Sequence, residues 1–181
     1  ARNTLNLPLN IPLIIFGTLG ANNSHHKGYD LLMKTLNNIK DDEHLKNMEL
    51  VVFGKNTSKP LPKMKFPIHY IGHLNDMDLI NLYSAADATI VPSRQEAFCQ
   101  TASESHACGT PVVAFDIGGL KDIVEHHKTG YLAKAFDTED LAKGISWVLD
   151  DKNKKLLGEQ ARVRAVEKFS QQVVIKQYQT V

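Results

Sequence analysis

Two glutamates, Glu96 and Glu104, have the types and spacing to do chemistry. Seven residues separate them within VPSRQEAFCQTASESHACGTPVVAF (Val91–Phe115), a stretch that otherwise reads as protein core. The residues between them are mostly small, and a short apolar run follows Gly109. Buried carboxylates are unfavourable unless a partner compensates them. The pair is therefore either surface charge or a device for binding a ligand.

A helix is expected to begin near Cys99 to Thr101, directly after the loop PSRQEAF. Its first backbone N–H groups would attract a phosphate, by roughly 0.3–2 kcal/mol from the helix dipole alone. Glu104, about one turn further on, would accept two hydrogen bonds from a vicinal diol such as ribose. Glu96 would reach hydroxyl groups beyond the phosphates. Periodicity equally favours a plain surface helix with one capping acid and one acid facing water.

The polar loop FGTLGANNSHHKGYDLL is a second candidate, because it ends in Lys27 and Gly28 at an expected helix start. A lysine there would neutralise a diphosphate across the cleft, whereas the alternative is an ordinary solvated lysine. The loop matches neither G-x-G-x-x-G nor the Walker pattern, which argues against a nicotinamide cofactor and ATP hydrolysis. A third loop carries Gly118 and Gly119, for which a tight turn is sufficient explanation.

Metal binding has weak support in the sequence. Asp76 and Asp78 form a D-x-D pattern, but they fall in the first turn of an expected helix, where capping explains them. His69 and His73 span a strand and its exit and do not lie on an expected helix, so a zinc site is not expected. No metal is therefore expected.

Composition indicates an ordinary globular domain. The 181 residues are 43% hydrophobic and 23% charged, and 21 basic residues against 20 acidic ones leave a formal net charge of +1. This balance gives no reason to expect nucleic acid or an anionic membrane as a partner. The two cysteines do not form a disulfide framework. Neither a signal peptide nor a membrane-length apolar run is recognisable, so a soluble, cytoplasmic domain is expected.

Short apolar runs alternate with helical periodicity along the chain. The expected strands are 12–17, 48–54, 68–74, 88–93, 110–115 and 130–133. The expected helices follow Gly28, begin at Asn75 or Asp76, begin near Cys99, occupy 118–126, and then cover 139–149, 153–168 and 171–179. Uniformly apolar strands separated by helices predict an α/β, doubly wound, mostly parallel Rossmann-like sheet with helices on both faces. Ligands bind beyond the carboxyl ends of such strands, which is where Glu96 lies.

The order of these motifs resembles the nucleotide-sugar half of retaining GT-B glycosyltransferases of the family 4 type. The resemblance runs from about Ile14 to Phe169 through LVVFG, IHYIGHL and LYSAADATIVPSRQEAFCQTASESHACGTPVVAFDIGGLKDIVEHHKTGYLAKAFDTEDLA. Its most specific part is E-x7-E set between PSR and GTPVVA.

The resemblance implies roles for individual residues. Glu104 would bind the ribose, Glu96 would contact the transferred sugar, and Lys27 would stabilise the leaving phosphate. The remaining donor contacts would come from Ala97, Phe98, Cys99, Gln100 and Thr101 around the diphosphate, and from Gly17, Thr18, Gly54 and His73. The implied donor is a UDP- or GDP-sugar, used without a metal. The implied reaction is hexosyl transfer with retention, in polysaccharide or glycoconjugate synthesis.

Two positions depart from the family pattern. Thr18 stands where an arginine commonly follows the first strand, so His25 or His26 would have to supply that phosphate contact. The usual E-G-F-G reads EAFC, which puts side chains at Ala97 and Cys99.

Residues 1–181 are expected to form a single donor-binding domain, with a core over about 12–169 and helices to about 179. The acceptor-binding N-terminal half of GT-B enzymes has no counterpart in this sequence. The isolated domain is therefore expected to bind donor weakly and to transfer little, and the absent half would carry any peripheral attachment to a membrane.

Three alternatives remain open at this stage. They are a GT-B epimerase or phosphorylase, a non-catalytic nucleotide-binding or regulatory module of the same fold, and an NAD-binding domain. Thr18 and Ala97 favour the non-catalytic module, and the absent glycine fingerprint argues against NAD.

Overall fold

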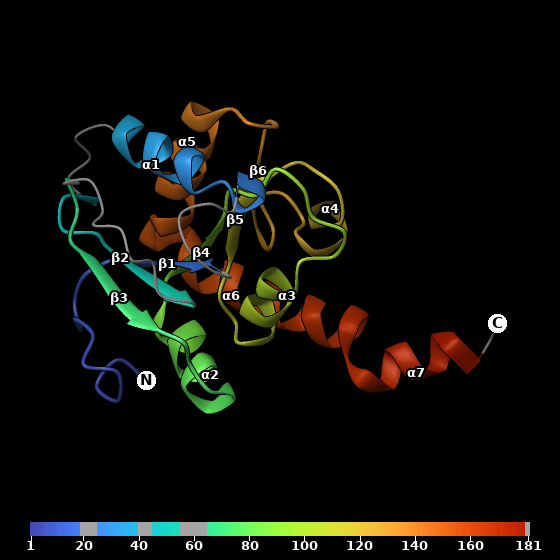
Figure 1. The fold of residues 1–181 in the computed structure, drawn as a ribbon. Helices are drawn as coiled ribbons and strands as arrows, with labels where there is room; N and C mark the ends of the chain where they lie inside the picture. The colour runs from blue at the N-terminus through green and yellow to red at the C-terminus, as the bar shows by residue number, and fades with distance from the viewer. Residues whose placement is uncertain (19–24, 40–44, 55–64, 180–181) are drawn as a thin grey trace.

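The apolar runs form one six-stranded sheet. The computed structural model describes residues 1–18, 25–39, 45–54 and 65–179 (Figure 1). The strand order is β3-β2-β1-β4-β5-β6, and every neighbouring pair is parallel. The strands are β1 Leu13–Thr18, β2 Glu49–Gly54, β3 Ile68–Gly72, β4 Ala88–Val91, β5 Val112–Phe115 and β6 Gly130–Ala133. The predicted doubly wound parallel sheet is confirmed.

The strand order reverses direction between β1 and β4. From β1 the chain proceeds outward to β2 and β3, then returns to β4 on the other side of β1 and continues to β5 and β6. Loops that leave the carboxyl ends of β1 and β4 therefore diverge, and the divergence opens a crevice. This switch point is where a ligand site is expected in the fold.

Helices connect and cover the strands as the periodicity predicts. Their bounds are α1 Tyr29–Asn38, α2 Asp76–Ala85, α3 Gln100–Ala107, α4 Leu120–Ile123, α5 Thr138–Leu149, α6 Asp151–Phe169 and α7 Gln171–Gln179, with a 3-10 turn, η1, at His25–Lys27. Asn75, Asp137 and Asp150 cap α2, α5 and α6 by accepting hydrogen bonds from backbone N–H groups of the first turn. The helix at 118–126 is shorter than expected, because its regular part ends at Ile123.

The core lies on both faces of the sheet. Ile14 and Phe16 of β1 pack with α1 and α5 on one face, whereas Leu13 and Ile15 pack with Leu82 and Tyr83 of α2 on the other. Helices α3 and α4 cover the β4–β5 part of that second face. Because both faces are covered, the inner strands are largely apolar, whereas the edge strand β3 carries His69 and the exposed Tyr70.

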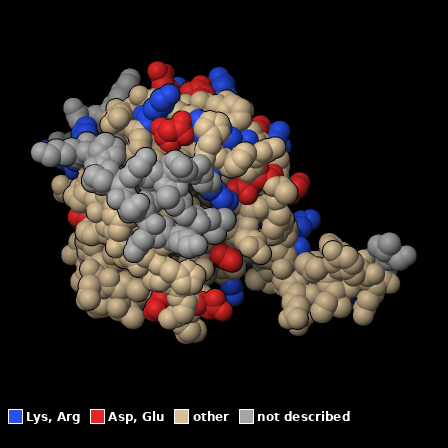
Figure 2. Space-filling model, in the orientation of Figure 1, with Lys and Arg blue, Asp and Glu red and all other residues tan. Residues whose placement is uncertain are grey.

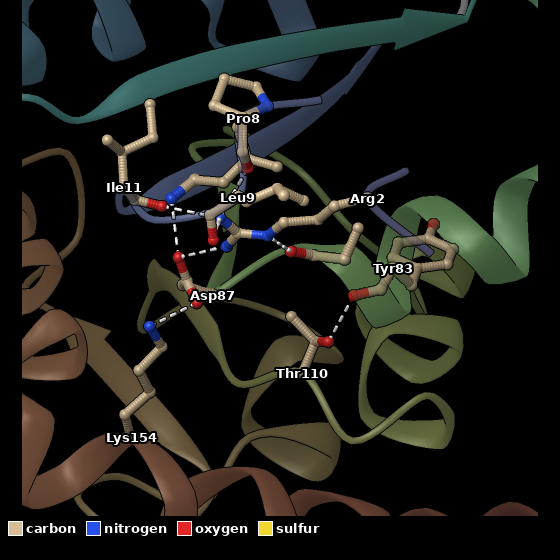
Figure 3. Close-up of polar contacts among 10 residues, drawn as sticks. Arg2, Pro8, Leu9, Ile11, Tyr83, Asp87, Thr110 and Lys154 are labelled. Atoms are coloured by element: carbon tan, nitrogen blue, oxygen red, sulfur yellow. Dashed lines mark hydrogen bonds and ion pairs between the residues drawn. The ribbon is translucent and has the colours of Figure 1, made fainter. Parts of the chain in front are cut away.

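An ion cluster closes the amino edge of the sheet (Figure 3). The buried Asp87 carboxylate accepts hydrogen bonds from the Leu13 backbone N–H at 2.7 Å and from Arg2 at 2.9 Å, and it also pairs with Lys154. The Arg2 guanidinium donates further hydrogen bonds to the carbonyl oxygens of Pro8, Leu9, Ile11 and Ala85. This cluster ties residues 1–12 to the base of β1 and β4.

Helix α7 projects away from the sheet (Figure 1), and none of its described side chains is buried.

Acidic and basic side chains are intermixed over the face of the molecule that Figure 2 shows. None of the helices in the described ranges is both long and apolar enough to cross a bilayer.

Candidate functional site

A cavity of about 400 Å³ opens at the carboxyl edge of the sheet, where β1, β2 and β4 end. All twelve predicted site residues line it: Gly17, Thr18, Lys27, Gly54, His73, Glu96, Ala97, Phe98, Cys99, Gln100, Thr101 and Glu104. They come from five separate segments of the chain, and the parallel sheet brings those segments together. Four further residues that the sequence did not single out as site residues complete the lining: Phe53, Leu74, Leu79 and Tyr83.

The carboxylate of Glu96 meets the ammonium of Lys27 in this cavity. Nζ of Lys27 lies 2.8 Å from Oε1 of Glu96, and Oγ of Ser93 donates to the same oxygen at 2.8 Å. The Glu96 side chain is 10% exposed and that of Lys27 is 24% exposed. Both charges are thus largely withdrawn from water and held against each other, so neither side chain is ordinary solvated surface.

Glu104 lies on α3 and lines the same cavity as this pair of charges. Its Oε2 accepts a hydrogen bond of 3.0 Å from the hydroxyl of Tyr83. Burial and the negative charge of Glu104 raise the pKa of Tyr83 well above its ordinary value, so the phenol stays protonated and donates. The Tyr83 ring packs edge-on against Phe53 at 5.8 Å, which fixes the direction of the hydroxyl.

Helix α3 presents its amino end to the cavity. It begins at Gln100 without a side-chain cap, and Cys99 before it adopts a left-handed backbone conformation with φ of 73°. The first N–H groups of an uncapped helix can bind an anion. Burial, followed by the charge of Glu96, raises the pKa of the Cys99 thiol to about 11. The thiol is therefore neutral at physiological pH.

Gly118 and Gly119 do more than form a turn, because both lie against the backbone of the loop that carries Glu96. The N–H of Gly119 donates to the carbonyl of Glu96 at 3.0 Å. A Cβ on Gly119 would lie 2.1 Å from the carbonyl oxygen of Ala97. The two loops approach this closely only because residue 119 lacks a side chain.

Two of the residues considered for metals, Asp78 and His69, have other partners. Asp78 accepts a hydrogen bond from the Asn75 side chain, and its backbone N–H donates to Asn75, as expected of a capped first turn. His69 pairs with Glu49 on the neighbouring strand. Within the described ranges, no group of three His, Cys, Asp or Glu side chains is placed to hold a metal ion.

The chain belongs to the family described as glycosyl transferases group 1, whose family model matches residues 13–164. Among curated relatives, it is 28% identical over 183 residues to a D-inositol 3-phosphate glycosyltransferase of Corynebacterium aurimucosum, covering 94% of this chain and 42% of the relative. It is 31% identical over 166 residues to a mannosylfructose-phosphate synthase of Agrobacterium fabrum, covering 84% and 35% respectively.

Solved structures share the fold. A sucrose-phosphate synthase from Thermosynechococcus elongatus superposes with a TM-score of 0.81 and 27% identity, covering 99% of this chain and 46% of that one. Anabaena HepE in complex with UDP-glucose superposes with a TM-score of 0.76 at 19% identity, covering 99% and 51%. These neighbours confirm the Rossmann-like GT-B architecture that the sequence predicts. The chain thus spans about half or less of the length of each of these relatives.

Proposed function

We propose that this chain is the donor-binding half of a retaining hexosyltransferase that uses a nucleotide diphosphate sugar. One observation supports the proposal most strongly: Lys27, Glu96, Glu104 and the amino end of α3 line the same cavity at the switch point of the sheet. The cavity therefore combines two donors for phosphate oxygens with two acceptors for hydroxyl groups. A nucleoside diphosphate joined to a sugar carries both kinds of group.

Each part of the proposed donor has a matching partner. The diphosphate would lie between Lys27 and the uncapped start of α3, where a cation and backbone N–H groups both favour negative charge. The ribose hydroxyls would donate to Glu104, whose carboxylate Tyr83 orients. The sugar would contact Glu96, and the base would lie near Gly54 and His73.

The chemistry expected of these residues is electrostatic. When the bond between sugar and diphosphate breaks, negative charge develops on the leaving phosphate. The Lys27 ammonium and the α3 N–H groups would stabilise that charge without any proton transfer. In this arrangement no side chain of the cavity has to act as a nucleophile, and the protonated Cys99 thiol agrees with that.

The reaction outside this cavity belongs to the same proposal. The donor would be a UDP- or GDP-sugar used without a metal, the configuration at the transferred carbon would be retained, and a second domain would supply the acceptor site. A polysaccharide or glycoconjugate acceptor is the broad class that the resemblance implies. The expected location is the cytoplasm, with any peripheral membrane contact made through the second domain.

The test is calorimetric titration of the chain with UDP, GDP, ADP and NAD, repeated on Glu104→Gln. The proposal expects one nucleoside diphosphate to bind, and the amide to weaken binding about tenfold or more, because a charged hydrogen-bond acceptor is lost. Glu159→Gln is the matched control, since Glu159 is exposed on α6 and does not line the cavity.

Two results would contradict the proposal. NAD as the preferred ligand would indicate a dinucleotide site, and nucleotide binding that is insensitive to Glu104→Gln would favour the non-catalytic module. If the isolated chain binds none of the four, the titration is repeated with the chain joined to its acceptor-binding half, and failure there would exclude a donor site.

A further inference from the structure

Arg94 makes an unusually complete set of contacts for a residue at the surface. Its Nη1 donates to the carbonyl of His25 at 2.8 Å, and Nη1 and Nη2 together bind both carboxylate oxygens of Asp30 at 2.8 and 2.6 Å. Its backbone N–H donates to the carbonyl of His26 at 2.8 Å. One residue of the β4–α3 loop thus holds three successive points of the segment around η1 and the start of α1.

That segment carries Lys27. The 3-10 turn η1 ends at Lys27, and Gly28 follows in a left-handed conformation with φ of 68°. A Cβ on Gly28 would lie 1.8 Å from the carbonyl oxygen of Pro92, so the turn sits directly on the loop that contains Arg94. These contacts therefore fix the position of Lys27 relative to the loop that carries Glu96.

We propose that Arg94 is a positioning residue: it clamps η1 to the β4–α3 loop and so holds the Lys27 ammonium against Glu96 in the cavity. Arg94 is not among the residues that line the cavity, so it acts through Lys27 rather than on a ligand. The inference that this clamp matters for nucleotide binding rests on the proposed function. The clamp of η1 by Arg94 does not depend on the proposed function.

The guanidinium geometry is what makes the clamp specific. A planar guanidinium binds two carboxylate oxygens in parallel while a further N–H reaches a carbonyl, whereas a lysine ammonium offers only a compact point charge. The hydrogen bond from Arg94 to Asp30 lowers the pKa of that carboxyl group, so the pair stays ionised at neutral pH. Arg94→Lys keeps the positive charge but loses the paired hydrogen bonds of the guanidinium. This variant therefore separates the effect of charge from the effect of positioning.

The first test measures Lys27 directly and needs no ligand. Wild type, Arg94→Ala and Arg94→Lys are treated with limiting acetic anhydride, and acetylation of Lys27 is quantified by mass spectrometry relative to the exposed Lys155. Both variants are expected to raise Lys27 labelling about fivefold, the factor that corresponds to a lost coupling of about 1 kcal/mol. The backbone hydrogen bond from Arg94 to His26 remains in both variants, so the expected change is release of the Lys27 ammonium from Glu96 and not unfolding of η1.

Arg164→Ala is the matched control. The Arg164 guanidinium also binds two carbonyl oxygens, of Asp122 and Ile123, and the carboxylate of Glu125, and its side chain is 21% exposed, as is that of Arg94. It clamps α4 to α6 and does not line the cavity. This variant should leave Lys27 labelling unchanged.

The second test is a double-mutant cycle on nucleotide affinity, with UDP, GDP or ADP as the probe, whichever binds wild type most tightly. Arg94→Ala should weaken binding about fivefold, and it should add almost nothing in a Lys27→Ala background, because the clamp acts through that lysine. Full additivity of the two losses would overturn the inference.

The outcomes separate the clamp from the proposed function. Unchanged Lys27 labelling in Arg94→Ala, or wild-type labelling in Arg94→Lys, overturns the clamp whatever binds. Raised labelling in both variants supports the clamp even if no nucleotide binds, and if none binds the chain joined to its acceptor-binding half either, it is the proposed function that fails.

Discussion

The orientation of Glu104 depends on a single hydroxyl group. Tyr83 donates to its Oε2 at 3.0 Å, and the Tyr83 ring is held in the core by Phe53 and Leu82. Removing the hydroxyl leaves that packing in place. Tyr83→Phe therefore tests the hydrogen bonds of this hydroxyl, with Glu104 and with Thr101, without changing the packing of the ring.

We expect Tyr83→Phe to weaken nucleoside diphosphate binding about three- to tenfold, the loss typical of one hydrogen bond to a charged group. The control is Tyr131→Phe, which removes a hydroxyl bonded at 3.0 Å to Asp140 on the β6–α5 side of the molecule. Titration calorimetry on both variants checks this, and equal losses in the two would show that the effect is not local to Glu104.

At the residue scale, sequence reasoning located the charged groups but not their partners. Glu96, Glu104 and Lys27 were found because carboxylates and a lysine beside small residues and a helix start indicate a ligand site. Tyr83 looked like a core residue of its helix, since its hydroxyl partner is 21 residues away. The contacts of Arg94 with Asp30, 64 residues away, are equally invisible before the sheet is assembled.

At the element scale, the loop before α4 acts as a support for the Glu96 loop. Gly119→Ala would bring a methyl group to 2.1 Å from the Ala97 carbonyl oxygen, so the Glu96 loop would have to move. We expect nucleoside diphosphate affinity to fall about tenfold or more, because both Glu96 and the start of α3 are displaced.

Gly158→Ala controls for the clash itself. A Cβ there would also meet a backbone oxygen, that of Gly109 at 2.5 Å, but Gly158 lies on α6 and does not line the cavity. This variant should lower the midpoint of thermal unfolding and leave the affinity of the folded protein unchanged. A Gly119→Ala protein with wild-type affinity would show that the loop is no support.

The elements themselves were predictable because both faces of the inner sheet are buried, which makes most of the strands apolar runs. Helix starts were predictable where a capping side chain marks them, as Asn75 does for α2. The amino-edge cluster of Arg2, Asp87 and Lys154 was not, because its members are 85 and 67 residues apart and each is an ordinary charge in the sequence.

At the scale of the whole molecule, a buried histidine links stability to pH. Burial, together with the positive charge of Arg164, lowers the pKa of His106 from 6.5 to about 4. The unfolded chain therefore takes up this proton near pH 6.5, whereas the folded chain takes it up only near pH 4. Stability must fall as the pH drops through this window.

We expect the free energy of unfolding to decrease by about 3 kcal/mol from this residue between pH 6.5 and pH 4. Urea unfolding of wild type and His106→Gln at pH 7, 5.5 and 4.5 measures it, because the variant lacks the titrating group. Parallel pH dependences in the two proteins would contradict a buried neutral histidine.

For the molecule as a whole, we propose that a nucleoside diphosphate binds at the carboxyl edge of the sheet and nowhere else on it. A second cavity, lined by Arg2, Asp87 and Lys154, lies at the opposite edge and provides an internal comparison. The most direct test is an amide NMR spectrum of the ¹⁵N-labelled chain during titration with UDP, GDP and ADP. The account predicts shifts at Gly54, Gln100, Thr101 and Glu104 and none at Leu149 or Lys154. Shifts gathered at the opposite edge would contradict it, as would the absence of shifts with any nucleotide at millimolar concentration once the chain is joined to its acceptor-binding half.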